Sequence, residues 1–130
     1  MIIFNFIMSN IFEGKKILIT GGTGSLGTAL TKKLLGLNID TIRIFSRNES
    51  KQIEMESKFD DERIRYFLGD IRDYNRLVRA VEDVDIVFHT AALKHVPKIE
   101  YNPFEAIKTN VIGSQNVIDA CIETNVSKAI

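Results

Sequence analysis

Short apolar segments alternate with longer amphipathic segments along most of the chain. The apolar segments have the length of buried strands, and they are 16–20, 41–45, 64–68, 85–89 and 126–130. The segments with apolar residues at helical spacing are 25–37, 49–59, 74–81 and 103–123. This alternation predicts an α/β fold in which helices cover both faces of a parallel sheet. We expect a Rossmann-type doubly wound sheet of order 3-2-1-4-5, truncated at strand 5, with a ligand crevice between strands 1 and 4.

The longest predicted helix begins with several start signals. Asn102 can cap it, Pro103 suits its first position, and Glu105 stands where a capping-box carboxylate reaches back. A stripe of apolar residues at helical spacing predicts its buried face. The stripe consists of Phe104, Ile107, Val111, Ile118 and Cys121.

Composition and charge narrow the classes of protein. Of 130 residues, 45% are hydrophobic and 26% charged, which is typical of one folded domain. Equal numbers of basic and acidic residues, 17 each, argue against a nucleic-acid binder, which needs a cationic excess. No segment approaches the roughly 20 apolar residues that span a bilayer, so we expect no membrane partner. We also expect no metal site.

The single cysteine and the apolar start of the chain bear on cellular location and on where the domain begins. Cys121 is the single cysteine and has no partner for an internal disulfide, so we expect a reducing compartment, the cytoplasm. The apolar start has no basic leading segment or cleavage site and is not typical of a signal peptide. We interpret 1–14 as a leader, with 1–7 outside the fold, and 15–130 as the cofactor-binding domain.

The strongest motif is the sequence TGGTGSLG, directly between the first strand and the first helix. Gly22, Gly24 and Gly27 fit G-x-G-x-x-G, and Gly21 with the last two also fits G-x-x-G-x-x-G. Glycine lets the chain turn sharply, approach a pyrophosphate and pack the helix on the sheet. An NTP-binding P-loop is excluded because Thr28 stands where its lysine would be. The motif therefore predicts a dinucleotide site, with a simple strand-to-helix turn as the alternative.

Residues after the second strand indicate which dinucleotide binds. An NAD site usually has an acidic residue there, whereas this chain has Ser46, Arg47 and Asn48, followed by Lys51. A hydroxyl and two cations suit the 2′-phosphate of NADP better than a diol. An exposed polar cluster is the alternative interpretation, and we choose NADP.

The third and fourth strands end in further candidate contacts. Asp70 is placed to accept from the adenine amino group and Ile71 to pack on the ring, although Asp70 could equally cap the third helix. After strand 4, Thr90, Ala91 and Ala92 are small enough for backbone to approach the cofactor, or to pack tightly on the fourth helix. His89 lies within an apolar strand, which favours a hydrogen-bonded core histidine.

Five segments together resemble a known superfamily. TGGTGSLG, FSRNESKQ, LGDIRD, HTAALKHVP and EYNPFEAIKTNVIGSQNV resemble the extended short-chain dehydrogenases/reductases. More narrowly, they resemble the UDP-N-acetylglucosamine 4,6-dehydratases of surface-polysaccharide biosynthesis. The resemblance runs from about Lys15 to the last residue.

The resemblance implies roles for individual residues. It assigns the pyrophosphate to Thr23, Gly24, Ser25 and Leu26, the 2′-phosphate to 46–51, and the adenine to Asp70 and Ile71. Lys94 would contact the nicotinamide ribose and the sugar nucleotide, unless it is a solvated loop lysine. His95, with Val96, would shape the substrate entrance. Asn110 would organise backbone and water near the active site or simply bond a helix partner.

The resemblance also implies that the catalytic motifs of the family are not among these residues. Members carry a Thr-Asp-Lys segment after strand 5 and a Tyr-x-x-x-Lys pair on the next helix, and these 130 residues contain neither. We therefore expect no catalytic residue here, but the cofactor-binding part of a longer, homo-oligomeric, NADP-dependent lyase acting on UDP-N-acetylglucosamine. Alone, the chain should be inactive and should expose Val111 and Ile118. The alternatives are a non-catalytic NADP-sensing module and a sugar-nucleotide epimerase.

Overall fold

A computed structural model describes residues 3, 7, 10–91 and 103–130, without the side chain of residue 108. The predicted site residues Ala92, Lys94 and His95, as well as Val96 and the cap Asn102, lie outside the described residues. Among the described segments, none of the helices is long and apolar enough to cross a membrane.

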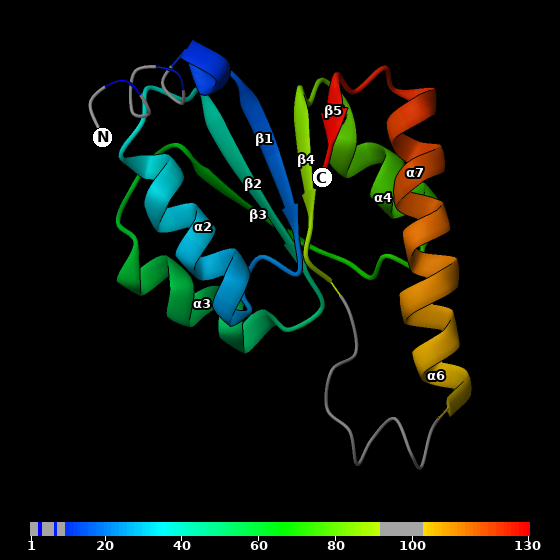
Figure 1. Ribbon diagram of the computed structural model, residues 1–130. Helices are drawn as coiled ribbons and strands as arrows, with labels where there is room; N and C mark the ends of the chain where they lie inside the picture. The colour runs from blue at the N-terminus through cyan, green and yellow to red at the C-terminus, as the bar shows by residue number, and fades with distance from the viewer. Residues whose placement is uncertain (1–2, 4–6, 8–9, 92–102) are drawn as a thin grey trace.

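Five parallel strands form one sheet of order β3-β2-β1-β4-β5, which confirms the predicted order (Figure 1). The strands are β1 (Lys16–Thr20), β2 (Thr41–Ser46), β3 (Ile64–Leu68), β4 (Ile86–His89) and β5 (Lys128–Ala129). In this register Thr20 lies beside both Phe45 and His89. The carboxyl ends of the three central strands therefore meet at one edge, where a doubly wound sheet binds ligands.

Helices cover both faces of the sheet, with α2 and α3 on one and α4 and α7 on the other (Figure 1). Their bounds are α2 (Ser25–Leu35), α3 (Glu49–Lys58), α4 (Tyr74–Val81), α6 (Pro103–Ile107), the π-helix η1 (Lys108–Ile112) and α7 (Gly113–Glu123). The helix α2 ends two residues before the predicted end, with Gly36 as its C-cap. The last three elements form one continuous helix, Pro103 to Glu123, as predicted, but with a π segment in its middle.

Strand residues alternate between two apolar cores. Ile17 and Ile19 face α2 and α3, whereas Leu18 faces α4 and α7, and all three are fully buried. Such strands read as continuous apolar runs because both faces are covered. Phe12, within the segment 1–14 that we interpreted as a leader, is also buried, and its ring lies 6.1 Å from that of Phe88. The packed domain thus includes Phe12, and the boundary at 15 stays a prediction.

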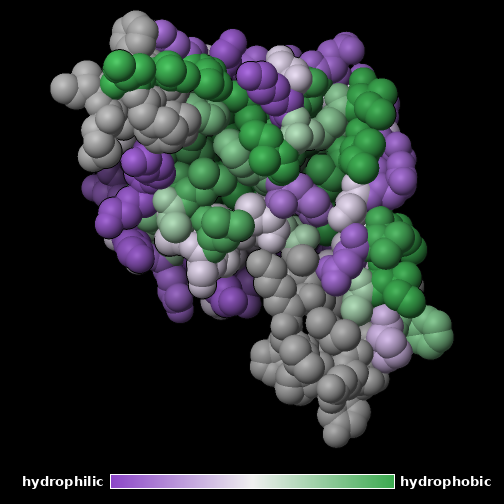
Figure 2. Space-filling view, in the orientation of Figure 1, coloured by the Kyte–Doolittle hydropathy of each residue, from purple (hydrophilic) through white to green (hydrophobic). Residues whose placement is uncertain are grey.

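Of the five residues predicted to form the buried face of the fourth helix, only Cys121 is buried. Phe104 (77% exposed) and Ile107 face outward, against the prediction, whereas Val111 and Ile118 are exposed as expected for this chain alone. Instead, the inward face consists of Thr109, Gly113, Val117, Ala120 and Cys121. Small residues turn inward because Gly113 meets Ile71 so closely that a Cβ on it would lie 2.5 Å from the Ile71 Cδ1. Figure 2 shows the apolar side chains gathered along the right-hand edge of the molecule, over this helix.

Candidate cofactor site

The glycine turn between β1 and α2 forms the floor of the candidate site. Gly21 has φ +65°, and its N–H donates to the Phe45 carbonyl at 2.8 Å. A Cβ on Gly21 would lie 2.8 Å from the backbone of Ala91, two residues after the end of β4. Only glycine satisfies both the left-handed backbone and this close approach. The turn thereby brings the ends of β1, β2 and β4 together.

The other glycines of the turn set the start of α2. A Cβ on Gly27 would lie 2.6 Å from the Gly22 Cα, so the helix packs directly on the turn. Gly24 is the N-cap and makes no side-chain capping bond. The positive end of the α2 dipole therefore faces the cleft with main-chain groups, an arrangement suited to a phosphate.

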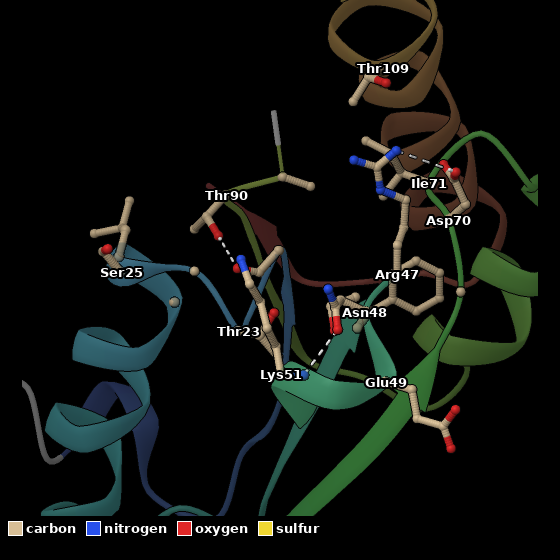
Figure 3. A pocket seen from close by; sticks show the side chains of 18 of the residues that line it. Thr23, Ser25, Arg47, Asn48, Glu49, Lys51, Asp70, Ile71, Thr90 and Thr109 are labelled. Atoms are coloured by element: carbon tan, nitrogen blue, oxygen red, sulfur yellow. Dashed lines mark hydrogen bonds and ion pairs between the residues drawn. The ribbon is translucent and has the colours of Figure 1, made fainter. Parts of the chain in front are cut away.

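At the end of β2, two of the predicted contacts also hold local structure. The buried Ser46 Oγ accepts from Gln52 Nε2 at 2.9 Å, and Asn48 caps α3 by accepting from the Lys51 N–H at 3.0 Å. Arg47 is half exposed and lies at the same edge as Lys51. The Glu49 carboxylate points away from both cations (Figure 3). The loop therefore offers two cations to the cleft and turns its carboxylate elsewhere.

Asp70, at the end of β3, is held mainly by Arg72. Its two oxygens accept from the Arg72 guanidinium at 2.6–3.1 Å, and one also accepts from the Arg72 N–H at 2.9 Å. Arg47 lies 3.9 Å away. Burial alone would raise the pKa of Asp70, but the Arg72 hydrogen bonds and the charges of Arg72 and Arg47 lower it below its usual value. The alternative role as a helix cap is wrong, because Asp73 caps α4.

The helix Pro103–Glu123 is fastened to the loop after Asp70. Asn116 Nδ2 donates to the Ile71 carbonyl at 2.9 Å and to the Arg72 carbonyl at 3.2 Å. Glu105 forms an ion pair with Arg72 at the other end of the helix. With Gly113 packed on Ile71 between them, the helix forms the second wall of the site.

His89 joins the two walls, and the prediction of a hydrogen-bonded core histidine is confirmed. Its Nδ1 lies 2.7 Å from Thr20 Oγ1, and its Nε2 lies 3.0 Å from Ser114 Oγ, which donates to the Asn110 carbonyl. Ser114 therefore accepts from Nε2–H, and Thr20 donates to Nδ1. Burial lowers the pKa of His89, which keeps the ring neutral in this arrangement.

These elements enclose a cleft of about 900 Å³ at the carboxyl edge of the sheet (Figure 3). The residues that line it are Gly21, Thr23, Gly24, Ser25, Leu26, Gly27, Phe45, Ser46, Arg47, Asn48, Glu49, Ser50, Lys51, Gly69, Asp70, Ile71, Thr90, Ala91 and Thr109. Every described residue that we predicted as a cofactor contact is in this set. Thr90 Oγ1 donates to the Thr20 carbonyl at 2.6 Å, which fixes the β4 end against the β1 end.

Sequence reasoning missed three of the lining residues, since Glu49 and Ser50 lie within the predicted 2′-phosphate segment 46–51. Phe45 and Gly69 adjoin predicted contacts, so the strand ends could have indicated them. Thr109 carries no such signal, because it lies mid-helix between Lys108 and Asn110, away from any strand end or glycine turn.

Comparison with known families matches residues 17–130 to the family described as polysaccharide biosynthesis protein. The chain belongs to this family. UDP-N-acetylglucosamine 4,6-dehydratase (inverting) of Campylobacter jejuni is 58% identical over 121 residues, 92% of this chain and 36% of that protein. UDP-glucose 4-epimerase of Rickettsia bellii is 46% identical over 124 residues, also 92% and 36%. The chain thus spans little more than a third of the length of these relatives.

Solved structures of nucleotide-sugar enzymes superpose on this chain. Pen from Bacillus thuringiensis superposes with a TM-score of 0.88 at 47% identity, over 91% of this chain and 36% of that one. DesIV, a dTDP-glucose 4,6-dehydratase from Streptomyces venezuelae with NAD and TYD bound, superposes at 0.77 and 27% identity, over 88% and 38%. A nicotinamide dinucleotide is therefore the cofactor class that the fold supports.

Proposed function

We propose that these residues form the NADP-binding part of a nucleotide-sugar 4,6-dehydratase that acts on UDP-N-acetylglucosamine in polysaccharide biosynthesis. The observation that carries the proposal is the cleft at the β1–β4 junction, floored by a glycine turn and flanked by Arg47 and Lys51. The C. jejuni relative, 58% identical, supports the substrate class and reaction.

The residues of the cleft fit NADP on three counts. The open N-terminus of α2 suits a pyrophosphate, with Thr23, Ser25 and Leu26 at its rim. Arg47 and Lys51 suit a 2′-phosphate, since the Glu49 carboxylate that could bind a free ribose hydroxyl points away (Figure 3). Asp70 and Ile71 stand where the adenine would lie. When bound, the cofactor accepts and returns hydride; the chain's own residues hold and orient it.

Lys94 and His95 complete the proposal on the substrate side. We assign Lys94 to the nicotinamide ribose and the sugar nucleotide, and His95 to the substrate entrance, with Ala92 beside the cofactor. The acid–base groups of the reaction belong to the remainder of the protein, and the whole enzyme acts as a homo-oligomer. The exposed apolar face of the Pro103–Glu123 helix supports that assembly.

The decisive experiment incubates the full-length protein with UDP-N-acetylglucosamine and follows the product by mass spectrometry. A dehydratase yields a product lighter by one water. An epimerase yields an isomer of unchanged mass, which would replace our proposal with the activity named for the R. bellii relative. Binding of NADP without any product would instead indicate a sensing module.

A further inference from the structure

Thr109 is a buried hydroxyl that no assigned role explains. Its side chain is only 4% exposed, and Oγ1 makes no hydrogen bond to any residue that the structure describes. It nevertheless lines the cleft, and it extends from the helix toward Arg47 and Ile71 (Figure 3). Buried hydroxyls almost always have a partner, because an unpaired one costs desolvation free energy. The missing partner should therefore be something that enters the cleft.

The position of Thr109 along its helix indicates which end of the cleft it serves. Glu105, Gly113 and Asn116 lie on the same side of the helix, the first two about two turns apart and the last two about one, and each contacts the Ile71–Arg72 loop. Thr109 lies between the first two of these contacts. Its hydroxyl is thus held over the segment that follows β3, far along the sheet edge from the glycine turn.

A π-helical segment contains this residue. The π-helix η1 covers Lys108–Ile112, where the backbone hydrogen bonds span five residues instead of four. Such segments occur frequently at functional sites. Because the regular helix resumes at Gly113, packed on Ile71, the register on either side of η1 is fixed by contacts with the loop.

The neighbouring polar groups are already engaged. Both Asp70 oxygens accept from Arg72, which uses most of the acceptor capacity of that carboxylate. A hydroxyl can both donate and accept, so it can bond either an amino group or a ring nitrogen. Thr109 is therefore suited to the polar edge of a heterocyclic base lying on Ile71.

We propose that Thr109 Oγ1 hydrogen-bonds the adenine of the bound dinucleotide. The inference rests on the proposed function and adds a contact that the sequence motifs do not indicate. It makes Thr109 a cofactor-binding residue rather than a structural one.

The test compares Thr109→Val with Thr109→Ser in the full-length protein. Valine keeps the shape and removes the hydroxyl, whereas serine keeps the hydroxyl. Calorimetry with NADP and with 2′,5′-ADP, which has the adenosine end alone, should show about tenfold weaker binding of both by the valine variant. The serine variant should bind both within about threefold of the wild type. NAD affinity should fall by the same factor, since NAD has the same adenine.

Thermal unfolding without ligand separates this role from a structural one. Because the hydroxyl has no partner among the residues that the structure describes, Thr109→Val should melt at the wild-type temperature or above it. A valine variant that binds both ligands as tightly as wild type would overturn the inference, and so would one that only loses stability. If the valine variant does not fold, Thr109→Ala against Thr109→Ser gives the same comparison. Failure of the wild type to bind any dinucleotide would instead overturn the proposed function.

Discussion

The two walls of the cleft are both helices at the edge of the same sheet, but they meet the site in opposite ways. The α2 wall presents main chain, through a glycine turn whose residues pack backbone against backbone. The Pro103–Glu123 wall presents side chains, among them the buried Thr109 in its π segment. One wall is fixed by backbone sterics, and the other by contacts between side chains and the Ile71–Arg72 loop.

This difference determines how each wall should tolerate change. A backbone contact cannot yield without moving an element, whereas a contact to the far end of a side chain can yield by rotation. The α2 wall should therefore be intolerant of added atoms. The Pro103–Glu123 wall should tolerate them at small cost in stability but with a change in what the cleft binds.

The largest expected effect contrasts two glycines. Gly27→Ala places a Cβ 2.6 Å from the Gly22 Cα and should lower the free energy of unfolding by about 3 kcal/mol. Gly113→Ala places a Cβ within 3 Å of the Ile71 Cδ1 and Cγ1, which are side-chain atoms, and should cost about 1 kcal/mol. Urea denaturation measures both. Equal losses would contradict the distinction between the walls.

Two matched variants control this measurement. Gly36→Ala, at the end of α2 with φ −75°, should change the free energy of unfolding by less than about 0.5 kcal/mol. Ile71→Val removes the Cδ1 that crowds position 113, so the double variant Gly113→Ala/Ile71→Val should lose less than the sum of the two single losses.

The next largest effect is on cofactor affinity, and it distinguishes the role of Arg47 from that of Thr109 on the Pro103–Glu123 wall. Arg47→Ala removes a charge-assisted contact worth about 1.5–3 kcal/mol and should weaken NADP binding at least tenfold, with NAD barely affected. Thr109→Val should weaken both cofactors alike. Calorimetry on the full-length protein checks this crossed pattern. Equal affinity of the wild type for NADP and NAD would remove the basis for our choice of NADP.

A smaller effect concerns the outer side of the second wall. Val111 and Ile118 are 62% and 51% exposed, and the isolated 130-residue chain should self-associate through this face. The double variant Val111→Lys/Ile118→Lys should reduce association in a light-scattering concentration series while leaving the melting temperature within a few degrees. A wild-type chain that stays monodisperse and monomeric at every concentration would contradict the prediction.

The smallest effect is on the pH dependence of stability, and it tests His89, which joins the two walls. Because burial lowers the pKa of His89 below its ordinary 6.5, the unfolded chain binds more protons than the folded one as pH falls. The His89 contribution to stability is present above pH 6.5 and is lost as pH falls from there toward the folded pKa. His89→Gln should flatten this part of the pH–stability profile, which denaturation at a series of pH values measures. Parallel profiles for wild type and variant would show that another group causes the slope.

Much of the site could be predicted because it consists of strand ends and turns. The glycine spacing after β1, the residues after β2 and Asp70 after β3 all lie next to elements with clear patterns, and the structure places them in one cleft. The sequence could not decide whether Asp70 caps a helix or binds the cofactor. Only the structure places Asp73 at the cap and Arg72 on Asp70.

The sequence by itself determined the alternation of strands and helices, and hence the parallel sheet and its order, because backbone periodicity and crossover handedness are local constraints. It did not determine which side of the Pro103–Glu123 helix is buried. Hydrophobicity pointed to Phe104, Ile107, Val111 and Ile118, yet Thr109 and Gly113 turn inward. Only the tertiary structure decides this, since the contacts of Glu105, Gly113 and Asn116 with the Ile71–Arg72 loop fix which side of the helix meets the domain.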